Sequence, residues 1–368
     1  MKVVFTCNRL GFGGAERVIS NFANRIIEDG HQVKIICLDI IEGFHYNIND
    51  KVEIIELDVK YKERKSFLNR KISGFINLYK LYVKLKDIKP DVIISFYTRQ
   101  NCYSIFIGNL LGIPVIASER DHFFTTDSKI NKLMRRFFYP HASGFIHQTQ
   151  WAREYLRKHY KIKKYDIVLP NPIWIKDYPE KCTISNQIIS VGRLDEQKNF
   201  EGLIRAFSKV AKKIPSATLY IYGEGKQRKN LEILIEQLNL TERVYLPGWY
   251  TDIINCYARA EIFVLFSYGE GYPNALMEAL SMGVPSISSN CPIGGPADMI
   301  INGYNGILVT PGDENELAEN IVYLLNNEQV REKFSNNAIK IRETNDFEYI
   351  YKKLINYIYT CIYYKRMV

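Results

Sequence analysis

The 368-residue sequence lacks the features typical of membrane-spanning, secreted and metal-binding proteins. No apolar run approaches the ~18 residues of a transmembrane helix. The first residues, MKVVFTCNRLGFGG, have neither the apolar core nor the cleavage site of a signal peptide. The seven cysteines are scattered and form no CxxC pair, which favours reduced thiols over disulfides. The six histidines form no HxxxH or HxH pair, so no metal site is expected.

The composition is that of a folded protein whose charge is unevenly distributed. Hydrophobic residues make up 46% and aromatic residues 13%, which excludes a disordered chain. Residues 1–180 hold 29 Lys and Arg against 19 Asp and Glu, whereas the remainder holds 20 against 21. The basic first half suggests an anionic partner, namely nucleic acid, anionic lipid or a phosphorylated substrate. A solvated basic surface explains the same asymmetry equally well.

Short apolar runs alternate with amphipathic helical stretches along the whole chain, which indicates parallel sheets covered on both faces. Such runs, bounded by Gly, Pro or Asp, are typical of buried strands. The predicted strands are 2–7, 31–40, 52–57, 91–97, 114–119, 143–149 and 165–170, then 187–194, 217–225, 243–248, 261–267, 285–289 and 306–313.

We therefore predict an α/β protein of two Rossmann-like domains. The proline-containing stretch 169–186 has little periodicity and marks the joint between them. The expected domains are 1–172 and 173–349, and a Tyr-rich amphipathic helix at about 350–368 is expected to pack back on the first domain.

The first glycine turn, NRLGFGGAERV at 8–18, follows the first strand and opens a helix. The helix is predicted from the apolar stripe Val18, Ile19, Phe22, Ala23 and Ile26, with Gly30 as its C-terminal cap. Gly13 and Gly14 would let backbone N–H groups approach an anion, although a plain tight turn explains them equally well. Glu16 stands where the third glycine of GxGxxG belongs, which disfavours a dinucleotide-dependent dehydrogenase.

The second half carries two further candidate motifs. In VGRLDEQKN, Arg193 and Lys198 follow a strand and could neutralise a diphosphate, the alternative being a solvated loop. In FSYGEGYPNALMEAL, Glu270 lies in a loop and Pro273 begins a helix whose first amides face outward. Glu278 lies in an apolar part of that helix, and because a buried carboxylate is costly without a partner we favour a functional role. It could accept hydrogen bonds from a ribose diol.

Together these motifs resemble the retaining glycosyltransferases of family 4, which have the GT-B fold of two Rossmann-like domains facing across a cleft. GGAER, VGRLDEQKN, YGEGYPNALMEAL, GVPSISSNCPIGGPADMI and NGILVTPGD follow one another in the family's order over nearly the whole chain. Glu270 to Glu278 is the family's EX7E motif. The segment CPIGGPADMI has Ala-Asp where Arg-Glu is usual, which weakens any role carried over to Asp298.

The resemblance implies roles for individual residues. Glu270 would contact the donor sugar and Glu278 the ribose, while Arg193 and Lys198 would hold the diphosphate. In the segment SERDHFF, either Arg120 or His122 would face the donor sugar and the acceptor. The other residues implied in substrate binding are Gly13, Gly14, Glu119, Gly271, Tyr272, Pro273, Asn274, Ala275 and Leu276.

The resemblance also implies a reaction, without cofactor or metal. A hexose or N-acetylhexosamine would pass with retention from a nucleotide sugar, expected to be UDP-linked, to a glycan acceptor. That acceptor is expected to be linked to polyprenyl diphosphate, in surface-polysaccharide or glycan biosynthesis at the inner face of the cell membrane. Preorganised cations and helix N-termini would stabilise the departing diphosphate. The alternatives are a nucleotide-sugar epimerase of the same fold, a glycosidase using the two glutamates, and a nucleic-acid-binding protein. For the glycosyltransferase itself, no nucleic acid is expected as a partner.

Two basic, aromatic stretches of the first half bear on the acceptor. Residues 60–89 are rich in Lys and Arg, and residues 132–141 read KLMRRFFYPH. Each could lie in an anionic membrane interface, or be a core-facing helix with a solvated basic face. The predicted apolar stripe of the first stretch consists of Phe67, Leu68, Ile72, Phe75, Ile76, Tyr79 and Tyr82 or Val83.

Overall fold

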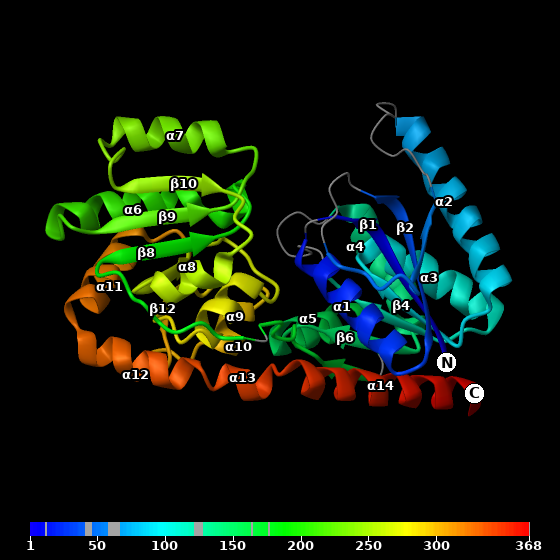
Figure 1. The fold of residues 1–368 in the computed structure, drawn as a ribbon. Helices are drawn as coiled ribbons and strands as arrows, with labels where there is room; N and C mark the ends of the chain where they lie inside the picture. The colour runs from blue at the N-terminus through cyan, green and yellow to red at the C-terminus, as the bar shows by residue number, and fades with distance from the viewer. Residues whose placement is uncertain are drawn as a thin grey trace. The chain divides into compact units, whose positions relative to one another are not determined.

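The computed structural model describes residues 1–11, 13–40, 46–57, 67–120, 128–162, 165–175 and 177–367. The chain divides into two compact units (Figure 1). The first consists of Met1–Pro170 together with Ile350–Val368, and the second of Asn171–Tyr349. Each unit is built on a parallel sheet, as the alternation of strands and helices predicts.

The first unit contains a seven-stranded sheet in the order β3-β2-β1-β4-β5-β6-β7. Its strands are β1 Lys2–Leu10, β2 Gln32–Ile40, β3 Glu53–Glu56, β4 Val92–Phe96, β5 Val115–Ser118, β6 Gly144–His147 and β7 Asp166–Val168. All of the strand pairs are parallel. The strand order reverses between β1 and β4, and in open α/β sheets ligands bind beside the carboxyl ends of strands at such a reversal.

Helices connect these strands, and the C-terminal helix α14 returns to the first unit from Ile350 onward. They are α1 Gly14–Glu28, α2 Phe67–Ile88, α3 Thr98–Leu111, α4 Lys129–Phe138, the 3₁₀ turn η1 Tyr139–His141, α5 Gln150–Tyr160 and α14 Phe347–Met367. The predicted stripe of α1 is buried, and Gly30 adopts a φ of +79° just beyond the helix end. Within the first unit, the hydroxyl of Tyr357 on α14 accepts a 2.7 Å hydrogen bond from the Phe145 N–H.

The part of the predicted stripe of α2 whose side chains are described is exposed or half-buried, and the buried residues lie on the opposite side of the helix. Phe75 and Tyr79 are 74% and 69% exposed, whereas Leu81 and Leu85 are fully buried. A core-facing role is therefore wrong for Phe75 and Tyr79. The side chains of Phe67, Leu68 and Ile72 lie outside the described part of the chain.

The second unit contains a six-stranded parallel sheet in the order β10-β9-β8-β11-β12-β13. Its strands are β8 Gln187–Val191, β9 Thr218–Tyr222, β10 Val244–Gly248, β11 Ile262–Leu265, β12 Ser286–Ser289 and β13 Ile307–Val309. Its helices are η2 Glu196–Lys198, α6 Phe200–Lys213, α7 Arg228–Gln237, α8 Ile253–Arg259, α9 Asn274–Ser281, α10 Gly295–Met299, α11 Glu314–Asn326, α12 Glu328–Ala338 and α13 Ile341–Thr344.

The hydrophobic core of the second unit lies on both faces of its sheet. One cluster joins side chains of one strand face, such as Ile188 and Val264, to helices α6, α7 and α11. The other joins the opposite strand face, including Ile189 and Phe263, to α8 and α9. Successive strand residues point to opposite faces, so a sheet covered on both sides requires continuous apolar runs.

Candidate functional site

Lys198 and Glu270, from different loops of the second unit, form a buried ion pair. The Lys198 Nζ lies 2.6 Å from Glu270 Oε1, and the two side chains are 14% and 7% exposed. The Ser267 hydroxyl donates a second hydrogen bond of 2.6 Å to the same oxygen. Within the described part of the chain, Oε2 of Glu270 has no hydrogen-bond partner. Lys198 ends η2 beyond β8 and Glu270 follows β11, so the pair lies beside the carboxyl ends of adjacent strands.

The loop after Glu270 is held in place by two buried asparagines. The Asn171 side-chain amide donates to the Tyr272 carbonyl at 3.2 Å and to Asn274 Oδ1 at 2.8 Å. The Asn345 amide donates to the Tyr272 hydroxyl at 2.7 Å. Burial, chiefly, raises the pKa of Tyr272 well above its usual range, so the hydroxyl stays protonated. Gly271 lies so close to Gly295 that a Cβ added to Gly295 would stand 1.8 Å from the Gly271 carbonyl oxygen.

Helix α9 begins at Asn274 with Pro273 as its N-cap, one residue later than predicted. The first backbone bond of the helix runs from the Met277 N–H to the Pro273 carbonyl at 3.1 Å. The N–H groups of Asn274, Ala275 and Leu276 come before this bond, at the N-terminus of the helix. N–H groups in that position attract anions.

Glu278 is buried one turn into α9, at 7% exposure. The Tyr257 hydroxyl donates to its Oε2 at 3.3 Å. Arg193 differs in being exposed: its side chain is 62% exposed and pairs with Asp195 at 3.1 Å. The structure thus brings Glu270 and Lys198 into direct contact, while Arg193 pairs within its own loop.

In the first unit, the predicted glycine turn lies beside the reversal of strand order. Gly13 caps α1 without a side-chain hydrogen bond. Glu16, in the first turn of α1, is 4% exposed, and its Oε1 accepts a 2.9 Å hydrogen bond from the Tyr97 hydroxyl. Gly14 is the first residue of the helix.

Glu119 belongs to a buried network in the first unit. Its Oε2 lies 2.8 Å from Arg135 Nε, with both side chains almost fully buried. The Tyr139 hydroxyl donates to Glu119 as well, as does the Thr98 hydroxyl at 3.1 Å. Both carboxylate oxygens accept hydrogen bonds from the protein, so this side chain stabilises the junction of β5, α3 and α4.

Arg120 follows Glu119 and covers the Phe96 ring, with its guanidinium carbon 5.2 Å from the ring centroid. Its Nε donates to the Ser118 hydroxyl at 3.0 Å. Burial lowers the pKa of Arg120 to about 10, which leaves it cationic at neutral pH. His122, the other residue predicted here, lies outside the described residues.

Several contacts of these candidates were not predicted from the sequence. They are the partners Ser267, Asn171 and Asn345 in the second unit, and Tyr97 in the first. Tyr97 ends a predicted strand run and Asn171 directly follows another, which is the one local signal that could have suggested them.

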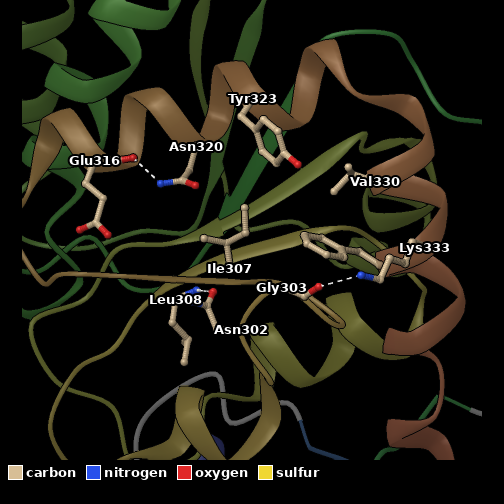
Figure 2. A pocket seen from close by; sticks show the side chains of 10 residues that line it. Asn302, Gly303, Ile307, Leu308, Glu316, Asn320, Tyr323, Val330 and Lys333 are labelled. Atoms are coloured by element: carbon tan, nitrogen blue, oxygen red, sulfur yellow. Dashed lines mark hydrogen bonds between the residues drawn. The ribbon is translucent and has the colours of Figure 1, made fainter.

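A cavity of about 290 Å³ lies elsewhere in the second unit, between α11, α12 and β13. Figure 2 shows Tyr323, Val330 and Lys333 lining it, with Lys333 donating to the Gly303 carbonyl. None of the predicted site residues lines this cavity.

No group of three or more His, Cys, Asp or Glu side chains that could hold a metal ion occurs in the described ranges. Of the helices within those same ranges, none is both long and apolar enough to cross a membrane.

Comparison with known proteins identifies the class of protein. The model described as "Glycosyl transferases group 1" matches residues 177–341, and that described as "Glycosyltransferase Family 4" matches residues 12–174. The structure of Anabaena Alr3699/HepE in complex with UDP-glucose superposes with a TM-score of 0.80 at 20% identity, covering 98% of this chain and 100% of that one. The fold is thus GT-B.

Two curated relatives are similar over most of their length. The GalNAc-alpha-(1->4)-GalNAc-alpha-(1->3)-diNAcBac-PP-undecaprenol alpha-1,4-N-acetyl-D-galactosaminyltransferase of Campylobacter jejuni is 30% identical over 95% of each chain. The lipopolysaccharide 1,6-galactosyltransferase of Salmonella typhimurium is 30% identical over 85% of this chain and 86% of its own. The chain belongs to the family 4 glycosyltransferases, as the sequence motifs predict.

Proposed function

We propose that this protein transfers a hexose or N-acetylhexosamine from a UDP-sugar to a lipid-linked glycan, with retention of configuration and without a metal. The observation that carries the proposal is the buried Lys198–Glu270 pair beside the carboxyl ends of β8 and β11. This pair places a cation for a diphosphate directly beside a carboxylate for a sugar hydroxyl.

The donor would be held by charge and by backbone amides. The Lys198 ammonium has three N–H donors. One of them donates to Glu270, so the other two can reach a diphosphate. The N–H groups of Asn274 to Leu276, with Arg193, would add donors and positive potential as the diphosphate leaves. Oε2 of Glu270 would accept a hydrogen bond from the donor sugar, and Glu278 from the ribose.

The choice of acceptor rests on the relatives. The Campylobacter relative is named for an undecaprenyl-diphosphate-linked glycan and the Salmonella relative for lipopolysaccharide, so both names describe lipid-anchored glycans. We infer the same class of acceptor here, and a UDP-linked donor because the HepE structure holds UDP-glucose.

Contact with an anionic membrane would follow from such an acceptor, and α4 offers a surface for it. Ile130, Leu133 and Phe137 are 60%, 55% and 62% exposed, three and four residues apart on one side of the helix. Lys129, Lys132 and Arg136 are exposed one residue before each of them.

The neighbouring helix extends this apolar surface. Phe106 and Leu110 of α3 are also exposed, and the Phe106 ring packs edge-on against Phe138 at 6.2 Å. Neither α3 nor α4 contains an acidic residue. Apolar side chains beside cations suit an interface of anionic lipid.

The activity is tested by incubating the protein with a panel of UDP-sugars and a farnesyl-diphosphate-linked N-acetylgalactosamine disaccharide. We expect one UDP-sugar to yield a glycosylated lipid with an α-linkage by NMR, at a rate unchanged by EDTA. A changed UDP-sugar formed without acceptor would instead identify an epimerase. A β-linkage would refute retention, and loss of activity with EDTA that added divalent metal restores would refute metal independence.

The membrane contact is tested by flotation with phosphatidylglycerol vesicles. We expect the variant Leu133→Ser/Phe137→Ser to bind at least tenfold more weakly than the wild type, because two exposed apolar side chains are lost. Tyr323→Ser, at an exposed position of the second unit, is the matched control. Equal binding of the variant and the wild type would exclude α4 as the membrane surface.

A further inference from the structure

A second cavity of the second unit lies in the groove between α6 and α7, beside the loop that carries Lys198. Its volume is about 370 Å³, within the range of about 300–1,000 Å³ that is typical of small-molecule sites. Its walls are η2, the first half of α6, one side of α7 and the side chain of Tyr268. None of the residues assigned to the donor lines this cavity.

Three carboxylates line the cavity, and each is paired with a cation. The pairs are Asp195 with Arg193 at 3.1 Å, Glu196 with Lys226 at 3.3 Å and Glu201 with Arg205 at 2.8 Å. A bound anion would lie beside these carboxylates, and like charges repel. A bound cation would have to compete with the existing partners. A neutral ligand with many hydrogen-bonding groups avoids both costs.

Side-chain amides form much of the polar wall and hold one another in place. The Gln227 amide donates to Glu196 Oε1 at 3.2 Å, and the Asn230 amide donates to Gln227 Oε1 at 2.7 Å. Gln237 lies two turns further along the same side of α7. Amides carry both donors and acceptors, and carboxylates add further acceptors. Such a wall can engage several neighbouring hydroxyls of a sugar ring.

Asn199, between η2 and α6, contributes a buried donor without a partner to this wall. The residue is 7% exposed and lines the cavity. Its Oδ1 caps α6 by accepting a 3.2 Å hydrogen bond from the Gly202 N–H, whereas its Nδ2 has no hydrogen-bond partner in the described part of the chain. A buried donor without an acceptor is unfavourable. A ligand oxygen at this wall would relieve the cost.

The floor of the cavity is apolar, and its rim carries an aromatic ring. Phe200, Leu231 and Leu234 are buried, whereas Tyr268 is 51% exposed. A tyrosine ring has an apolar face and a polar tip, so the C–H groups of a sugar ring can pack against it. The apolar floor beside the amides suits an acetamido group, which joins a methyl group to a polar amide.

We propose that this cavity is a non-catalytic glycan-binding site that takes an N-acetylhexosamine unit. The wall binds hydroxyls, the floor accepts the acetamido methyl group, and Tyr268 covers the ring. The Tyr268 N–H also donates to the Gln197 carbonyl at 2.9 Å, next to Lys198, so the site adjoins the donor loop. The inference goes beyond the transfer reaction, because sugar binding here requires neither UDP nor turnover.

Photo-crosslinking tests this site. An N-acetylgalactosamine disaccharide with a diazirine in one acetyl group is irradiated with the protein in saturating UDP, and labelled peptides are identified by mass spectrometry. We expect labelling within 196–205 or 227–237. Asn230→Trp should reduce it at least fivefold, because the larger side chain occupies the cavity. Ile233→Trp, at a 52% exposed position of α7 outside the cavity, is the matched control.

A second variant removes polar groups without adding bulk. Gln227→Ala/Asn230→Ala should also reduce the labelling at least fivefold, since the hydrogen bonds of two amides are lost. If Asn230→Trp has a lowered Tm, this double variant decides the result. Unlabelled disaccharide should displace the probe at a concentration at least tenfold below that of maltose, which has no acetamido group.

Three outcomes would overturn the inference. They are labelling confined to other segments, equal labelling of the wild type and the folded cavity variants, and labelling that excess disaccharide does not displace. Equal displacement by maltose would refute the choice of an N-acetylhexosamine. Labelling is measured without sugar transfer, so a wild type labelled in these segments that transfers no sugar would contradict the proposed function alone.

Discussion

The Lys198–Glu270 pair allows a quantitative test of how the donor site is held before substrate binds. The Glu270 side chain is buried, the Lys198 side chain is only 14% exposed, and their charged atoms are 2.6 Å apart. Removing one partner of such a pair costs about 3–5 kcal/mol, because the other charge stays buried without compensation. In Lys198→Met, Glu270 keeps the Ser267 hydroxyl on Oε1, so we expect the lower end, about 3 kcal/mol.

This loss translates into a measurable change in melting temperature. For a domain of 150–250 residues each kcal/mol shifts Tm by about 2–4 °C, so the second unit of Lys198→Met should melt about 6–12 °C lower. Glu270→Gln should also destabilise it. The double variant should recover part of the loss, with a coupling free energy of about 1–3 kcal/mol, because neither charge is then left alone.

Urea unfolding of the wild type, both single variants and the double variant, with and without UDP, provides the assay. UDP at one hundred times its Kd should add about 2.7 kcal/mol to the wild type and much less to Lys198→Met at the same concentration. Free-energy changes that add within about 0.5 kcal/mol would show that the two side chains are not coupled. Undiminished stabilisation of Lys198→Met by UDP would remove Lys198 from the diphosphate site.

Two further predictions concern other parts of the fold. In Gly295→Ala the new Cβ would stand 1.8 Å from the Gly271 carbonyl oxygen, so the loop should shift and UDP-sugar affinity should fall about tenfold by calorimetry; unchanged affinity would separate this loop from the donor site. Burial lowers the pKa of His147 below its usual value, so its neutral form stabilises the fold above about pH 6.5 and this contribution is lost as the pH falls. The wild type should therefore lose more Tm between pH 7 and pH 5 than His147→Asn, and equal losses would contradict this.

Much of the fold could be predicted because buried parallel strands leave a local signal. Each predicted strand run overlaps an observed strand, since short β-branched segments between Gly, Pro and Asp have few other uses. The predicted stripe of α1 is buried for the same reason: apolar residues recur there at helical spacing and at few other positions.

The face of α2 could not be predicted, because apolar residues surround the helix. Leu81 and Leu85 are buried while Phe75 and Tyr79 are exposed, although all four are apolar or aromatic residues of the same helix. With apolar side chains on every side, periodicity does not decide which face meets the sheet. Only the packing of the first unit does so.

The candidate site shows the same division between local and long-range information. Residue types and spacing suggested Lys198 for the diphosphate, and the family resemblance implied Glu270 for the sugar, as two separate contacts. Their pairing joins residues 72 positions apart, and no local pattern encodes it. The pairing changes the expected chemistry, because a carboxylate that orients the ammonium also determines where its remaining N–H groups point. Glu270 should therefore matter for binding UDP alone, which carries no sugar for it to contact.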